Sequence, residues 1–460
     1  MVATRAPRTI DLAALIDGRK LSPFNYVLIA LSTLITLFDG LDMFMVSYTA
    51  PYMRDELGLT NSQLGNVFSS GTVGMVLGGL AFTYVGDRIG RRPTIVFAGL
   101  AFGVLTFVTG FATSYPALLA LRFLDGLAIG GMLPLAWALN IEFLPKKVRA
   151  TAIAFVMMGF SFGSASAGPL TNWLAPIHGW EGVYFAGGGA TLICAIIIAI
   201  WLPESPRFLV TKALNPALTV KTLKRLEPTI DIQLGDNIVL GDEGVRKGGL
   251  KVGDLFEGRL KWVTPLMWLG YGFSALGIFF KSTWGPIVLE ATNISRVTAA
   301  NVSALSGLLG AIAGVLLMKA AERFGLPLVA LCTALIVPLA LLIGFEVIPV
   351  EGTLFLPAIV VQSMLVGACH TAIISQLSIF YPTAIRASAG GCASAVGKVG
   401  GIVGPLIGGY LLDAGMPAVR TYAVAAICPA ILVICVIAIY NIMRKPQAEP
   451  TLNGTVAPAE

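Results

Sequence analysis

The chain has 460 residues, of which 56% are hydrophobic and only 12% are charged, and its formal net charge is +6. Soluble proteins carry about 25% charged residues, so a chain with this few charges cannot cover a water-exposed surface. The composition excludes a set of soluble domains and predicts an integral membrane protein. No basic cluster is interleaved with aromatic residues, which argues against a nucleic-acid partner.

Twelve apolar runs are long enough to cross a hydrocarbon core about 30 Å thick, which requires about 20 helical residues. In chain order they lie at about 24–50, 63–85, 93–113, 116–141, 150–173, 182–202, 263–289, 298–319, 327–347, 353–380, 387–412 and 418–442. Runs this long and continuous predict helices and not the strands of a barrel. The expected fold class is therefore an all-α integral membrane protein with twelve transmembrane helices.

One long polar stretch divides these spans into six and six. We expect a cytoplasmic N-terminal tail at 1–23, a six-helix bundle at 24–203, a cytoplasmic linker loop at 204–262, a second six-helix bundle at 263–443 and a cytoplasmic C-terminal tail at 444–460.

The Lys and Arg side chains indicate the orientation of the chain in the membrane. With both termini inside, 25 of the 31 lie in cytoplasmic segments, three lie outside and three lie within spans. Cytoplasmic loops carry such an excess of basic residues. The distribution predicts a multi-pass protein of the cell inner membrane with both termini in the cytoplasm, and it explains the net positive charge without a further partner.

Segments of the first half recur in the second half at nearly one offset. Residues 143–152 align with 380–389 at an offset of 237, and 168–170 align with 404–406 at an offset of 236. A third, weaker match follows in the same order. Two fused but unrelated units are the alternative, but three ordered matches indicate duplication. Two pseudo-symmetric six-helix bundles around a central site are typical of secondary transporters.

Three motifs resemble those of the major facilitator superfamily over the whole chain. The loop after the second span reads Gly86-Asp87-Arg88-x-Gly90-Arg91-Arg92, span four contains 122–131, and 203–207 follows span six. Within the superfamily, 38–42 in the first span resembles the paired-aspartate motif of the aromatic acid:H+ symporter family.

This resemblance implies a proton-coupled transporter that imports an aromatic carboxylate, such as a benzoate or hydroxybenzoate, by alternating access. The expected partners are the small aromatic acid, protons and the lipid bilayer, and the expected functional unit is a monomer. A sugar or other small-metabolite:H+ symporter is the alternative, favoured by 203–207. A receptor would require a larger soluble domain, and fixed central cations argue against efflux of cationic drugs.

Enzyme and metal-site patterns are lacking from the sequence. It contains no GxSxG, HExxH or glycine-rich phosphate loop, so we do not expect an enzyme. Its six cysteines lie in apolar stretches without a CxxC pair, so we expect neither a metal nor a cofactor.

Four charged residues within spans are candidates for proton coupling. Asp39 and Asp42 lie on one helix face, about 22 and 27 Å from the start of their span. Charges at this depth are costly and usually face a cavity or a partner. Asp39 and Asp42 either carry protons or form an ion pair that locks the bundles. Arg122 and Asp125 have the same spacing; Arg122 pairs either with Asp125 or, as the resemblance implies, with an aspartate of span one.

Lys281 and Lys398 lie near mid-depth and are the candidate counter-charges for a substrate carboxylate. Ion pairing or snorkelling would also explain them. Lys398 matches a position where the resembled family usually has a basic residue, whereas Lys281 departs from that pattern. Phe280 and Trp284 suit an aromatic ring, although plain packing is the commoner role. His370 is either a substrate ligand or a satisfied hydrogen-bonding residue.

The remaining candidates belong to a cytoplasmic gate. They are Asp87, Arg88, Arg91, Arg92, Glu142 and Arg149. We expect Glu142 to close the gate against Arg149. The conformational role of the turn at 86–92 is implied by the resemblance, whereas the residues alone indicate a charged cytoplasmic turn.

Overall fold

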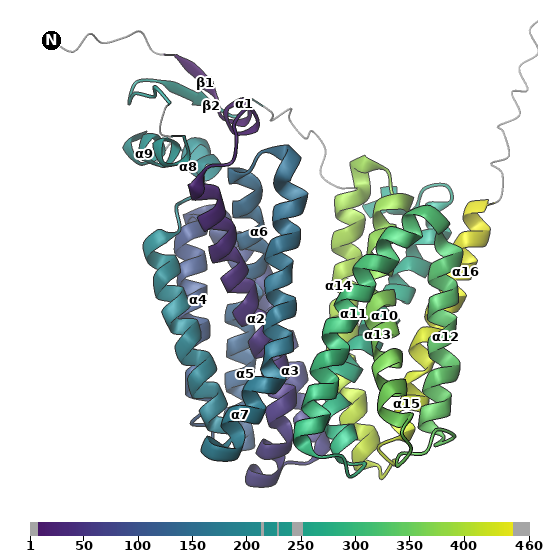
Figure 1. Ribbon diagram of the computed structural model, residues 1–460. Helices are drawn as coiled ribbons and strands as arrows, with labels where there is room; N and C mark the ends of the chain where they lie inside the picture. The colour runs from purple at the N-terminus through teal and green to yellow at the C-terminus, as the bar shows by residue number, and fades with distance from the viewer. Residues whose placement is uncertain (1–7, 213–215, 228–229, 242–251, 445–460) are drawn as a thin grey trace, which may run out of the picture.

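The computed structural model describes residues 8–212, 216–227, 230–241 and 252–444 (Figure 1). The expected C-terminal tail at 444–460 therefore lies almost wholly outside the described residues, as do parts of the expected N-terminal tail and linker. The described chain forms two bundles of long helices that stand side by side (Figure 1).

The N-terminal bundle contains six membrane-length segments. Its helices are α2 (Pro23–Leu57), α3 (Asn61–Ile89), α4 (Arg91–Thr109), α5 (Tyr115–Gly130), α6 (Met132–Phe143) and α7 (Lys146–Trp201). Helices α5 and α6 together make one span, Tyr115–Phe143. Helix α7 contains two spans, because Gly179 has a φ of 68° and interrupts its helical geometry. A left-handed φ of this kind suits glycine, which has no Cβ.

The C-terminal bundle repeats this arrangement. Its helices are α10 (Leu260–Glu290), α11 (Arg296–Phe324), α12 (Leu326–Gly344), α13 (Phe355–Phe380), α14 (Thr383–Asp413), α15 (Arg420–Ala425) and α16 (Ile427–Arg444). Helices α15 and α16 form one span, Arg420–Arg444. Among the described residues, 11 helical stretches are long and apolar enough to cross a membrane, and the stretch made by α7 counts twice. The predicted all-α fold with twelve transmembrane helices is confirmed.

The N-terminal tail and the linker form a small layer on the N-terminal bundle. The tail contains β1 (Thr9–Asp11) and α1 (Leu12–Asp17), and the linker contains α8 (Pro206–Lys212), α9 (Pro216–Leu226), β2 (Asn237–Val239) and the 3-10 helix η1 (Val252–Phe256). Strands β1 and β2 pair in parallel. Leu12 and Ile16 are buried in one core with Leu223 and Leu226. Strands of three residues are too short for sequence periodicity to predict.

Close packing of α3 against α5 depends on glycine. A Cβ at Gly126 would collide with the carbonyl oxygen of Gly71, and one at Gly130 would collide with that of Met75. Small residues allow backbones to approach in this way in membrane bundles. The contact places α5, and with it Arg122, deep inside the N-terminal bundle.

The two ends of the bundles differ. We call the end with the tail and the linker the linker end, and the opposite end the far end. Figure 1 shows the bundles separated at the linker end and close together at the far end. Toward the far end, the Ser47 hydroxyl of α2 donates to the carbonyl oxygens of Ser282 and Thr283 of α10, at 2.9 and 2.7 Å. The Ser69 hydroxyl of α3 donates to the carbonyl of Ile402 of α14 at 2.7 Å.

Candidate functional site

A cluster of buried charges lies inside the N-terminal bundle. The Arg122 guanidinium of α5 donates to both carboxylate oxygens of Asp42 on α2, at 3.0 and 2.9 Å. It also donates to Asp125, one turn further along α5, at 2.7 Å. The Thr106 hydroxyl of α4 donates to the other oxygen of Asp125 at 3.1 Å. The sequence left open whether Arg122 pairs within its helix or across to the first span, and in the structure it does both.

Asp39 belongs to the same region but is bonded differently. It lies one turn before Asp42 on α2 and is 1% exposed. Neither of its carboxylate oxygens has a hydrogen-bond partner within the described part of the chain. Burial of an unpaired charge is costly. The region therefore contains three carboxyl groups and one guanidinium, an arrangement with the capacity to hold an added proton. We refer to Asp39, Asp42, Thr106, Arg122 and Asp125 as the Arg122 cluster.

A cavity of about 230 Å³ lies between the two bundles, and we call it the central cavity. Helices α2 and α7 line it from the N-terminal bundle, and α10, α11, α13 and α15 line it from the C-terminal bundle. Its aromatic lining residues are Phe44, Tyr48, Phe160 and Tyr422, and its hydroxyl-bearing ones include Ser161, Ser164, Ser303, Ser306, Ser363 and Thr371. The lining is thus mainly apolar but carries many groups that donate and accept hydrogen bonds.

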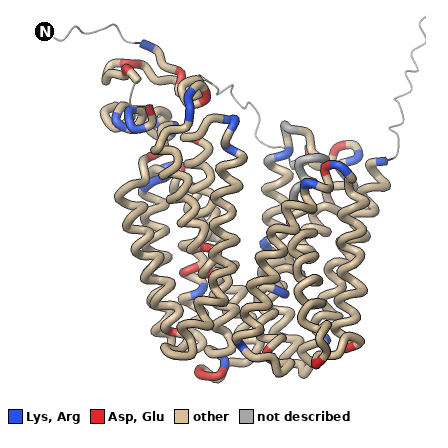
Figure 2. Tube along the Cα trace, viewed as in Figure 1, with Lys and Arg blue, Asp and Glu red and all other residues tan. Residues whose placement is uncertain are grey.

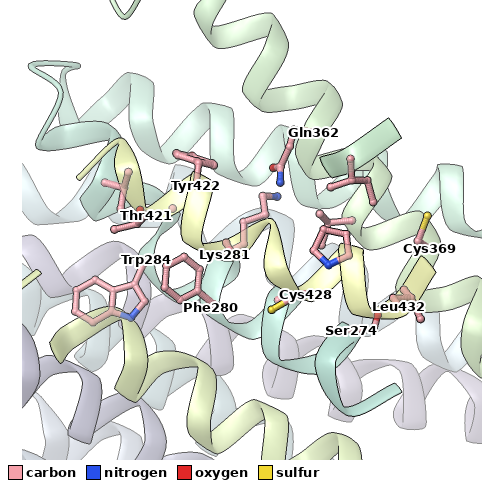
Figure 3. A pocket seen from close by; sticks show the side chains of 17 residues that line it. Ser274, Phe280, Lys281, Trp284, Gln362, Cys369, Thr421, Tyr422, Cys428 and Leu432 are labelled. Atoms are coloured by element: carbon pink, nitrogen blue, oxygen red, sulfur yellow. The ribbon is translucent and has the colours of Figure 1, made fainter. Parts of the chain in front are cut away.

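Lys281 is the charged residue in this lining. It also borders a second chamber of about 40 Å³ inside the C-terminal bundle. Figure 3 shows its ammonium pointing toward the side-chain amide of Gln362, close to Tyr422. No acidic side chain among the described residues forms an ion pair with it. Lys281 therefore places its amino group between two cavities, and no acidic side chain in the described part of the chain pairs with it.

Phe280 and Trp284, the predicted ring contacts, line this second chamber. Both are buried. The Trp284 indole donates to the carbonyl of Pro405 at 2.9 Å and packs edge-to-face on Phe68 of the N-terminal bundle, with ring centroids 5.6 Å apart. Trp284 thus helps to join the bundles, and the aromatic groups of the central cavity come from other helices.

Neither His370 nor Lys398 lines the two cavities around Lys281. The Nδ1 atom of His370 is 3.0 Å from the Ser274 hydroxyl, and its ring stacks on Tyr271 at 5.3 Å. Lys398 is partly buried on α14, and its ammonium faces Gly79 of α3 across the bundle boundary. Of the predicted substrate ligands, the structure places Lys281 alone in the lining of the central cavity, as far as the described residues show.

The predicted gate residues lie at the linker end. Arg91 forms an ion pair with Glu142 at 2.8 Å, and Glu142 also accepts a hydrogen bond from Ser205. Arg149 instead lies 3.8 Å from Asp17. The expected pairing of Glu142 with Arg149 is wrong, because the turn that carries Arg91 reaches Glu142 while the N-terminal tail brings Asp17 to Arg149.

The other gate residues also contact the N-terminal half. Asp87 is 64% exposed and lies 3.9 Å from Arg91. Arg88 stacks over an aromatic ring of α3 at 4.2 Å, and Arg92 donates to a backbone carbonyl of α7 at 2.8 Å. Partial burial raises the pKa of Asp17, but hydrogen bonds from Lys146 and nearby positive charges outweigh it and lower that pKa below its usual value.

Sequence reasoning missed the aromatic lining of the central cavity. Phe44 and Tyr48 are four residues apart on the helix of Asp39, a spacing that puts them on one face. That spacing was a usable signal. Phe160, Tyr422 and Gln362 had none, because no motif or spacing distinguishes them from the other residues of their spans. Across the described ranges, no group of three or more His, Cys, Asp or Glu side chains is placed to hold a metal ion.

Solved structures share this fold. A bacterial homologue of the human lysosomal transporter Spinster, in an inward-facing and occupied conformation, matches 92% of this chain and 98% of its own with a TM-score of 0.69 and 18% identity. The xylose transporter XylE from E. coli, in an inward open conformation, matches 92% of this chain and 98% of its own with a TM-score of 0.67 and 17% identity. At these identities the likeness establishes the fold alone.

Curated relatives match most of the sequence. A 4-hydroxybenzoate transporter of Pseudomonas putida is 29% identical over 89% of this chain and 91% of its own length. A gallate transporter of the same species is 29% identical over 88% of this chain and 90% of its own length. A benzoate transport protein of Acinetobacter baylyi is 27% identical over 96% of this chain and 95% of its own length.

The sequence profile of the Major Facilitator Superfamily matches residues 32–256 and 267–458, which span both bundles. The solved structures agree with this match in fold, and the curated relatives are transporters and not enzymes. The chain belongs to the Major Facilitator Superfamily and is a multi-pass membrane transporter.

Proposed function

We propose that this chain is a proton-coupled secondary active transporter that imports an aromatic carboxylate by alternating access. The observation that carries the proposal is the position of Lys281, whose ammonium borders the central cavity without an acidic partner among the described residues. A charge removed from water requires a counter-charge. The carboxylate of a bound substrate supplies one through a charge-assisted hydrogen bond.

The rest of the central cavity suits an aromatic ring. An apolar cavity of about 150 Å³ is large enough for benzene, and the central cavity has about 230 Å³. Phe44 and Phe160 pack edge-on with ring centroids 6.2 Å apart and offer aromatic contacts from two helices. The hydroxyl groups of Ser164 and Ser303 lie in the same lining and are suited to bind ring hydroxyls. The names of the curated relatives support this substrate class.

Proton coupling is assigned to the Arg122 cluster. Asp39 and Asp42 are the proposed proton carriers, while Arg122 and Asp125 tune them. Arg122 donates two hydrogen bonds to Asp42, whereas buried Asp39 has no described hydrogen-bond partner. One proton with one monoanion moves no net charge. A second proton would add about 2.3 kcal/mol per 100 mV of membrane potential.

The linker end is proposed to face the cytoplasm of a cell inner membrane. Figure 2 shows Lys and Arg residues gathered on the tail, the linker and the helix ends at this end, as the positive-inside rule requires of a cytoplasmic face. The separation of the bundles at the linker end then corresponds to an inward-facing state (Figure 1). Phe280, Trp284, His370 and Lys398 would reach substrate only after a movement of the helices. A monomer suffices, since both bundles that line the central cavity belong to one chain.

Counterflow in proteoliposomes tests the substrate class. Vesicles preloaded with unlabelled benzoate, 4-hydroxybenzoate, gallate or D-xylose are diluted into the labelled compound, with empty vesicles as the control. We expect exchange of at least one aromatic acid and none of D-xylose. Exchange of D-xylose without any aromatic acid would instead establish the alternative, a sugar:proton symporter, which residues 203–207 favour.

A further inference from the structure

A groove of about 520 Å³ lies on the outer side of the N-terminal bundle, away from the central cavity. The first turns of α2 and the last turn of α7 form its walls, with Phe24, Val27, Leu31, Ile200 and Trp201 in the lining. Arg225 of α9 completes it. We propose that this groove binds an anionic phospholipid, with an acyl chain along its apolar wall and the phosphate at Arg225.

The apolar wall lies on the surface that a membrane would cover. Val27 is 40% exposed and Ile200 is 68% exposed. Trp201 and neighbouring Tyr26 are 60% and 61% exposed, and exposed Trp and Tyr concentrate at the boundary between hydrocarbon and headgroups. The mouth of the groove is therefore at headgroup depth, and the acyl chain of a lipid in it would extend along α2.

Charge decides which lipid fits. Arg225 is the charged residue in the lining, and no acidic side chain of the described residues pairs with it. A guanidinium matches the oxygens of a phosphate in two-point hydrogen bonding. Further basic residues lie on the helices of the linker (Figure 2), so the field around the groove favours a lipid with net negative charge over a zwitterionic one.

The position of α9 gives such a lipid a structural role. Leu223 and Leu226 pack this helix into the core shared by the tail and the N-terminal bundle, and its exposed face carries Lys221, Lys224 and Arg225. A lipid in the groove would contact α2, α7 and the linker together, and would join the linker to the bundle that carries the Arg122 cluster.

Retention of lipid through detergent purification tests the proposal. The full-length protein is reconstituted with equal amounts of phosphatidylglycerol and phosphatidylcholine of identical chains, re-extracted, and analysed by native mass spectrometry. We expect at least a fivefold preference for phosphatidylglycerol in the unmodified protein. Arg225→Gln should remove that preference. Lys221→Gln, the same charge change on the same helix outside the groove lining, should change it less than twofold.

A second variant probes the apolar wall without changing charge. Val27→Trp fills the groove from an exposed position and should reduce retention of both lipids at least threefold. Equal loss of the preference in Arg225→Gln and Lys221→Gln would overturn the proposal in favour of general surface charge, as would full retention in Val27→Trp. These readouts measure lipid and not transport, so they are independent of the substrate proposed above.

Discussion

The two bundles differ in whether their buried charged residues have partners. In the N-terminal bundle, Arg122 of α5 is bonded to Asp42 of α2 and to Asp125 of its own helix, and Asp125 is also held by Thr106 of α4. In the C-terminal bundle, Lys281 borders two cavities, and no described acidic side chain neutralises it. A charge with partners adds to the stability of the fold, whereas one without them is available to a ligand. The difference supports a division in which one bundle handles protons and the other holds the substrate.

Removal of Arg122 should produce the largest effect. Loss of one partner from a buried ion pair costs about 3–5 kcal/mol because the remaining charges stay buried. Arg122→Leu should therefore lower the thermal unfolding temperature strongly and reduce transport to background. Stability is measured by thermal unfolding in detergent, with Arg323→Gln on the exposed end of α11 as the control.

A compensated variant sharpens this result. Combining Arg122→Leu with Asp42→Asn and Asp125→Asn removes both uncompensated carboxylates, so it should regain much of the lost stability without regaining proton-driven uptake. Unchanged stability in Arg122→Leu alone would contradict the view that the cluster depends on its guanidinium.

The proton carriers come next. Asp39→Asn replaces an unpartnered carboxyl group with an amide of equal size, so it should leave folding intact and abolish accumulation driven by a pH gradient. Asp42→Asn should also abolish this accumulation, but it removes a partner of Arg122 and should therefore lower the unfolding temperature as well. Counterflow exchange, which needs no net proton movement, should persist in Asp39→Asn. Full proton-driven uptake in both variants would remove these residues as carriers.

Lys281 should give a smaller but more selective effect. A hydrogen bond to a charged group contributes about 1.5–3 kcal/mol, so Lys281→Gln should weaken benzoate binding by roughly 10- to 100-fold. Benzamide, which has the ring without the charge, should bind equally to both proteins. Calorimetric titration gives the affinities, and Lys319→Gln on the exposed surface of α11 is the control. Equal loss for both ligands would make Lys281 a structural residue.

The smallest expected effect concerns a contact that holds the two bundles together at the far end. At the far end, Asp413 of α14 accepts hydrogen bonds from the backbone amides of Asn61 and Ser62, at 3.0 and 2.7 Å. These amides begin α3, where the helix dipole favours a negative charge. Asp413→Asn weakens this contact between bundles and should increase opening at the far end about two- to fivefold.

Opening is measured as the rate at which an impermeant maleimide, added from the far side, labels Ser164→Cys in a background without native cysteines. Glu351→Gln, an exposed charge of the same sign, is the control. A labelling rate that is identical in Asp413→Asn and the parent protein would show that this contact does not hold the bundles closed.

The sequence by itself determined the fold and most of the buried charges. Apolar runs of about 20 residues are local features, and lipid forces their backbone into helices. Charged residues within such runs are rare because burying a charge in lipid is costly. Asp39, Asp42, Arg122 and Lys281 therefore stand out in the sequence as charged residues inside predicted spans. The duplication and the loop charges were equally local, and they indicated two bundles and an orientation.

Only the tertiary structure decided what each of these residues contacts. Asp42 and Arg122 are 80 residues apart and meet because the tertiary fold brings a side chain of α2 to a side chain of α5. The aromatic lining of the central cavity comes from three different helices, and apart from the spacing of Phe44 and Tyr48 no periodicity marked the residues that point inward. In lipid the outside of a bundle is as apolar as its core, and hydrophobic patterning therefore cannot distinguish a packed, a lipid-facing and a cavity-lining side chain.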